Sequence, residues 1–157
     1  MKMFKKLVAV ALAAVMALTM LTACGGSGSS TTVDPEVQAV LAGLNKRRVE
    51  LGVGKVQLNS DMNAFAKEVA QARLSYIDGK IKEAEFYNTL SKCMQKAKAL
   101  NLGDGKTRCG ALYAGSLKTD FSNTSSSSSV VGSDAKYEGI AVVHDGTKVV
   151  TVVLVRY

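Results

Sequence analysis

The side chains of this chain that could do covalent or metal chemistry are few: three cysteines and one histidine. A thiol can act as a nucleophile, bind a metal or form a disulfide, and an imidazole can act as a general base or a metal ligand. Both kinds of chemistry need several such groups gathered in one place. The histidine, His144, falls in a predicted turn, and the spacing of Cys93 and Cys109 is not typical of a metal site. We therefore expect no catalytic residue, no metal ligand and no cofactor.

The remaining cysteine, Cys24, ends a segment with the layout of a secretory signal. Three lysines precede an uncharged run from Leu7 to Ala23, and a positive start, an apolar middle and a small residue at the cleavage point are typical of such signals. The run is also long enough for a short transmembrane helix. What favours a cleaved signal is the sequence of residues 21–24, Leu-Thr-Ala-Cys, which resembles the bacterial lipobox.

The lipobox resemblance implies that the thiol of Cys24 takes a diacylglyceryl group and that the chain is cut before it. We therefore expect an extracytoplasmic protein, bound to the bacterial cell membrane through lipid on Cys24. Two acyl chains give a stable anchor, because each buried methylene contributes about 0.8 kcal/mol. The predicted organisation is a signal peptide at 1–23, a lipidated cysteine and flexible Gly/Ser tether at 24–32, and one domain at 33–157.

Charge argues against one class of partner. The chain has a formal net charge of +7, but part of it belongs to the lysines of the signal, so the mature protein is only mildly basic. A nucleic-acid groove needs a clustered basic face, and apart from Arg47 and Arg48 the arginines are scattered. We expect no nucleic-acid partner. An envelope protein or a small apolar ligand is the expected partner besides the membrane.

Cys93 and Cys109 form an even pair once Cys24 is assigned to lipid. In an oxidising compartment such a pair predicts a disulfide, which would stabilise the domain by roughly 3 kcal/mol in the chain-entropy model. Two free thiols are the alternative, since many anaerobic bacteria avoid structural disulfides.

The predicted elements of the domain alternate between helices and strands. Asp34-Pro35 is typical of a helix start, with an acid at the N-cap and proline at the first helical position. Apolar spacing then predicts the following elements: a helix from Pro35 that ends at Gly52 and Gly54, an extended piece at 56–58, helices at about 62–76 and 82–100, and a strand at 107–117. Seven serines between residues 122 and 133 predict a mobile loop.

The clearest β pattern lies at the end of the sequence. Residues 137–143 and 149–157 are rich in β-branched and aromatic side chains, and the Asp-Gly pair in the connection 144–148 is typical of a hairpin. The second strand is nearly all apolar, which predicts a central strand that is covered on both faces.

This order of elements resembles the CAP superfamily, the secreted domains related to cysteine-rich secretory proteins and plant pathogenesis-related proteins. The resemblance rests on these stretches: Leu44–Arg48, residues 51–54, residues 56–59, Met62 and Ala66 on the next helix, and the hairpin strands 137–143 and 151–157. It implies an α+β fold, an α-β-α sandwich with a central antiparallel sheet and a C-terminal β-hairpin.

The chain departs from the family pattern at the residues of the family's central cleft. Family members place two histidines and two acids in a central cleft that often binds a divalent metal. Here no histidine lies in or just after the second helix, and residues 108–115 lack the glutamate and asparagine expected there. We therefore carry over no cleft residue and expect a non-catalytic binding or interaction module. The alternatives are a wall-directed hydrolase or metal-binding protein with a degenerate cleft, and a structural spacer in the envelope.

Overall fold

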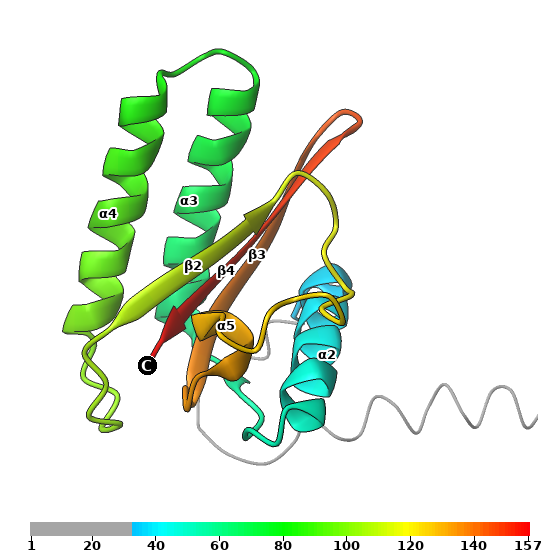
Figure 1. Ribbon diagram of the computed structural model, residues 1–157. Coiled ribbons are helices and arrows are strands. Elements are labelled where there is room, and N and C mark those ends of the chain that lie inside the picture. Colours follow the sequence, from blue (N-terminus) through cyan, green and yellow to red (C-terminus); the bar gives the residue numbers. More distant parts are fainter. Residues whose placement is uncertain (1–32) are drawn as a thin grey trace, which may run out of the picture. The chain divides into compact units, whose positions relative to one another are not determined.

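The computed structural model describes residues 33–157, so the predicted signal, Cys24 and the tether lie outside the described residues. The domain mixes helices and strands, which confirms the α+β class (Figure 1). Its elements in chain order are α2 (Pro35–Glu50), β1 (Gln57–Leu58), α3 (Ser60–Ile77), α4 (Glu83–Ala99), β2 (Cys109–Ala114), α5 (Ser129–Gly132), β3 (Tyr137–Asp145) and β4 (Lys148–Arg156).

The four strands form one sheet in the order β1-β3-β4-β2. β4 pairs antiparallel with both β3 and β2, whereas β1 runs parallel to β3. The expectation of a purely antiparallel sheet is therefore wrong at its short edge. Three helices and β2 separate β1 from β3 in the chain, so no tight turn forces the two strands to run in opposite directions.

The predicted hairpin is confirmed. β3 and β4 pair from Tyr137 and Arg156 to Asp145 and Lys148, and a two-residue turn joins them. Gly146 in this turn has a φ of 58°, which glycine adopts without steric cost. β4 is buried from Val150 to Arg156, as its apolar sequence predicts for a strand with neighbours on both edges.

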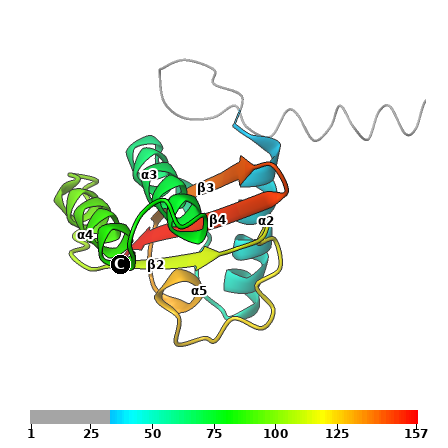
Figure 2. The ribbon, with the colours of Figure 1, turned by 90° about the horizontal axis from the view of Figure 1, so that it is seen from above.

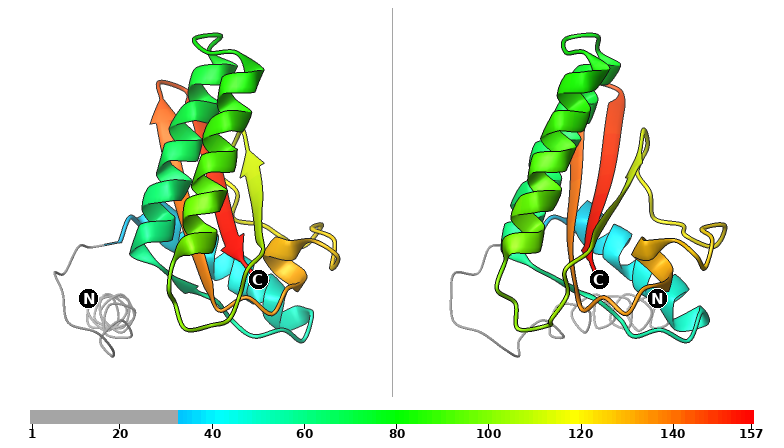
Figure 3. Two further views of the ribbon diagram at one scale, coloured as in Figure 1. Left: turned by 90° about the vertical axis from the view of Figure 1, so that its left-hand side faces the viewer. Right: turned by 60° about the vertical axis from the view of Figure 1, so that its left-hand side comes forward.

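Helices lie on both faces of the sheet (Figures 2 and 3). The side chains of β4 alternate between two apolar clusters: Val152 and Leu154 pack with α3 and α4, and Val153 and Val155 pack with α2 and α5. Phe86 is buried in the first cluster. This alternation is the period of two that a strand imposes on its side chains.

The helix starts follow the predicted capping chemistry. The Asp34 carboxylate accepts a hydrogen bond from the backbone N–H of Glu36, and Asn59 accepts one from the N–H of Met62. α3 then approaches β3 closely, since a Cβ atom at Gly139 would lie 2.1 Å from the carbonyl oxygen of Met62.

The serine-rich segment 122–133 is more ordered in secondary structure than the sequence predicts, because it ends in α5. Val130 and Val131 are buried in this short helix and join the cluster beneath α2. The serine content of the segment predicted a loop, but these two valines supply the apolar surface that holds the end of the segment in place.

Candidate functional site

The CAP resemblance places a cleft where the end of α3 meets β2, and the structure brings these two segments together around Arg73. The guanidinium carbon of Arg73 lies 5.1 Å from the ring centroid of Tyr76, 5.2 Å from that of Phe86 and 4.9 Å from that of Tyr113. We call Arg73, Tyr76, Phe86, Tyr87 and Tyr113 the arginine–aromatic cluster.

Local structure explains how the cluster forms. Arg73 and Tyr76 are three residues apart on α3, so they share one face of the helix. Phe86 lies in the first turn of α4, and its ring meets that of Tyr113 on β2 edge to face at 5.5 Å. The rings of Tyr76 and Phe86 stack at 6.0 Å, within the range in which aromatic pairs stabilise a fold.

Arg73 keeps its hydrogen-bonding capacity free. Among residues 33–157 its guanidinium makes no hydrogen bond and no ion pair, and its nitrogens are not among the buried unpartnered atoms. Its N–H groups therefore reach solvent, while the aromatic rings offset the charge on its face. A guanidinium held in this way can donate two parallel hydrogen bonds to a carboxylate or a phosphate.

Tyr87 extends the cluster to the surface, where it is 46% exposed. The neighbouring Tyr113 raises the pKa of Tyr87 above its usual range. From Tyr87 a groove of about 280 Å³ follows the outer flank of α4. Its lining residues are Tyr87, Leu90, Ser91, Met94, Gln95 and Lys98.

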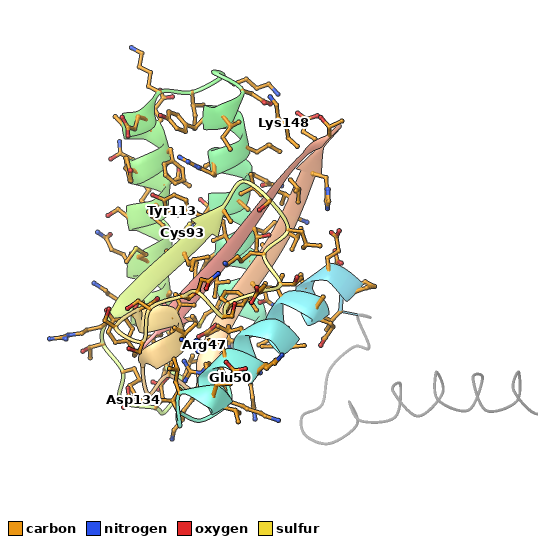
Figure 4. The ribbon with its side chains drawn as sticks, turned by 45° about the vertical axis from the view of Figure 1, so that its right-hand side comes forward. Arg47, Glu50, Cys93, Tyr113, Asp134 and Lys148 are labelled. Atoms are coloured by element: carbon orange, nitrogen blue, oxygen red, sulfur yellow. The ribbon has the colours of Figure 1, made fainter. Side chains whose placement is uncertain are left out.

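Cys93 and Cys109 are both free thiols in the structure. Burial raises the pKa of Cys93 to about 11 and also raises the pKa of Cys109, so neither thiol is activated as a nucleophile. Figure 4 labels Cys93 on α4 and Tyr113 on β2. The predicted disulfide is not formed here, and it stays a prediction for the oxidised protein.

His144 lies near the end of β3, and not in the turn that follows it. Its Nε2 atom is 2.6 Å from a carboxylate oxygen of Glu36 in the first turn of α2. The pair is exposed and joins the hairpin to the first helix of the domain. His144 therefore belongs to a surface contact between elements, away from the arginine–aromatic cluster.

The described part of the chain holds no group of three or more histidine, cysteine, aspartate or glutamate side chains that could hold a metal ion. Nor does it contain a helix long and apolar enough to cross a membrane. A second, wider groove of about 630 Å³ lies on the outer face of α2 and includes Leu41 and Val49. Its lining mixes these apolar side chains with the charged residues Lys46, Glu50 and Lys55.

Arg48, for which the sequence predicts no role, is fully buried. Its guanidinium donates hydrogen bonds to the carbonyl oxygens of Gly54, Val130, Ser133 and Ala135. The helical spacing of the sequence indicates this burial, because position 48 continues the apolar stripe of positions 37, 40 and 44. Arg48 thus holds α5 and the start of β3 against α2, and it is sealed from any ligand.

No protein-family profile, no curated protein and no solved structure matches the chain.

Proposed function

We propose that this protein is an extracytoplasmic lipoprotein, anchored to the membrane through lipid on Cys24, whose CAP-like domain is a non-catalytic binding module. The order of its elements and the placement of helices on both faces of the sheet support the α-β-α sandwich that the family resemblance implies.

One observation carries the proposal. The two segments that would hold the family's cleft residues converge, but they bring together Arg73, Tyr76 and Tyr113 in place of histidines and acids. General acid–base chemistry needs a group that titrates near neutral pH at the reacting atoms. Arginine and tyrosine instead dominate recognition surfaces, where they offer flat apolar area together with hydrogen-bond donors.

The anchor is tested by metabolic labelling of the full chain with radioactive palmitate in a bacterial host. We expect label on the wild type and on a Cys93→Ala variant, and none on Cys24→Ala, because only Cys24 is the proposed acceptor. Peptide mass mapping then locates the modified residue. Equal labelling of Cys24→Ala and wild type would overturn the lipoprotein assignment.

The non-catalytic assignment is tested by titrating the full chain with zinc and with calcium while its melting temperature is followed. A flat response supports the binding module. A saturable rise would favour the alternative that the resemblance raises, a metal-binding protein or wall-directed hydrolase with a degenerate cleft.

A further inference from the structure

β2 is an edge strand, and half of its backbone groups have no partner. Arg108 and Tyr157 exchange both backbone hydrogen bonds, which fixes the register of the ladder with β4. In an antiparallel pair the bonded residues alternate, so Gly110, Leu112 and Ala114 bond to β4. The N–H and C=O groups of Cys109, Ala111 and Tyr113 therefore point away from the sheet, and within the described residues they make no other backbone bond.

The groove is lined by side chains of α4 alone, and α4 packs beside β2. Tyr87 at one end of the groove is a neighbour of Tyr113 on β2, and Lys98 at the other end is near enough to Cys109 for its charge to act on that thiol. Five residues of β2 span these two points, a length of about 13 Å at 3.3 Å per residue. We call the free edge of β2, together with the neighbouring flank of α4, the slot. Figure 3 shows β2 as the outermost strand beside α4.

Positive charge follows the slot. Arg73 lies under the Tyr113 end, Lys98 flanks the Cys109 end, and the exposed Arg108 immediately precedes β2. None of these three cations has an ion-pair partner among residues 33–157, whereas Lys96 on the opposite flank of α4 pairs with Glu68. The groove itself is lined by no acid. The charge of one acid, Glu83, acts on Tyr87 at one end, and Asp104 near the other end is paired with Arg156.

We propose that the slot binds an extended acidic segment of a partner protein, which adds to the free edge of β2 as a fifth strand. The proposal rests on the binding function proposed above and names its partner class. Backbone bonds to Cys109, Ala111 and Tyr113 hold the segment, as in other complexes that extend a sheet. Alternate side chains of the segment point toward the face of the sheet that α3 and α4 cover, where carboxylates meet the free donors of Arg73 on α3 and Lys98 on α4.

The test uses the full chain in detergent and an acetylated hexapeptide of alternating glutamate and valine, titrated by fluorescence anisotropy. The lysine–valine counterpart tests charge, and a glutamate–valine peptide with N-methyl groups at alternate residues tests backbone pairing. We expect saturable binding of the first peptide alone. Hydrogen exchange at the amide of Ala111 should slow when it binds.

Variants locate the site. Ala111→Pro removes an outward N–H and leaves the β2–β4 ladder intact, so it should weaken binding by about tenfold or more without changing the melting temperature. Lys98→Gln and Arg73→Gln should each weaken binding by about tenfold, the effect of losing a charged hydrogen bond. Lys92→Gln is the matched control, because Lys92 lies on the flank of α4 that faces Glu68.

The proposal is overturned if the lysine and glutamate peptides bind equally, if Ala111→Pro folds and binds as the wild type does, or if the N-methylated peptide binds fully. It is also overturned if light scattering shows that a second copy of the chain occupies the edge. If Ala111→Pro does not fold, binding of the N-methylated peptide to the wild type decides whether backbone pairing is needed. A further outcome is that the peptides fail to bind while Cys24 is still lipidated and the protein does not respond to metal. This result would overturn the acidic-segment proposal alone, and the binding-module function would stand with a different ligand.

Discussion

The guanidinium of Arg48 and the carboxyl group of Glu138 lie 3.8 Å apart, and neither side chain is exposed. Arg48 comes from α2 and Glu138 from β3, so the pair joins the first helix to the central hairpin. The two partners are unequally satisfied. Arg48 donates to four carbonyl oxygens, whereas both carboxyl oxygens of Glu138 lack a hydrogen-bond partner among the described residues.

Replacing Arg48 should cost much of the stability of the domain. We expect Arg48→Met to lower the free energy of unfolding by about 3–5 kcal/mol, because it leaves Glu138 and several buried carbonyl oxygens uncompensated. The matched control is Arg47→Met, since Arg47 is partly exposed and pairs with Glu50 at the surface (Figure 4). The control should lose no more than about 1 kcal/mol. Urea unfolding of the two variants measures the difference. Equal losses of unfolding free energy would contradict the conclusion that Arg48 holds α5 and β3 against α2.

The stability of the wild type should fall with rising pH relative to Glu138→Gln. Burial raises the pKa of Glu138 well above 4.5, and the charge of Arg48 opposes this only in part. A carboxyl group whose pKa is higher in the folded state stabilises fully below its unfolded pKa, and this contribution is lost as pH rises toward the folded value. The slope cannot exceed about 1.4 kcal/mol per pH unit for one proton. Urea midpoints between pH 4 and pH 8 test this, and parallel curves for the two proteins would refute it.

Asp78 should contribute in the opposite direction. Hydrogen bonds with Lys148 on β4 and Lys80 in the α3–α4 connection lower its pKa to about 2. The stabilising contribution of Asp78 is therefore present above its unfolded pKa of 3.8 and is lost as pH falls toward 2. We expect the melting temperature of the wild type to drop more than that of Asp78→Asn between pH 4.5 and pH 2.5. Asp61→Asn, at an exposed position without an ion pair, should follow the wild type.

A methyl group at Gly139 should not fit. Because its Cβ atom would lie 2.1 Å from the carbonyl oxygen of Met62, Gly139→Ala must push α3 away from β3. Overpacking of this kind costs typically about 1–3 kcal/mol. Gly54→Ala is the control, since no heavy atom lies within 4 Å of a Cβ there. Chemical denaturation of both variants provides the comparison, and an equally stable Gly139→Ala protein would show that the two elements can separate freely.

The two thiols should react at different rates in the reduced protein. Cys109 is half-buried, whereas Cys93 is fully buried with a pKa raised to about 11. We therefore expect iodoacetamide to modify Cys109 well before Cys93, as followed by peptide mass mapping. Equal rates would contradict the burial of Cys93. If the protein is isolated without reductant and neither thiol reacts until reductant is added, the disulfide predicted from the sequence forms in solution.

Local patterns predicted the elements well, because capping oxygens, apolar spacing and the Asp-Gly turn act over a few residues. Asn59 caps α3 and β4 is doubly buried, as their sequences indicate. Contacts between distant segments were not predictable in this way. Arg48 is a charged residue on an apolar stripe, and its partners at 130–138 lie far along the chain. Tyr113 meets Arg73 only after three elements have folded, so neither residue stands out in the sequence as part of a site.

The position of β4 in the sheet has a consequence for the order of events during synthesis. β2 and β3 both pair with β4, and β4 follows every other element in the chain. A chain that emerges amino end first can form its helices early, but it cannot assemble the sheet before residues 148–156 appear. Until then β3 lacks its antiparallel partner, and the side chains of α2 and α3 that pack on β4 stay uncovered. The nascent domain should therefore stay open, sensitive to protease and able to bind chaperones until its central strand arrives.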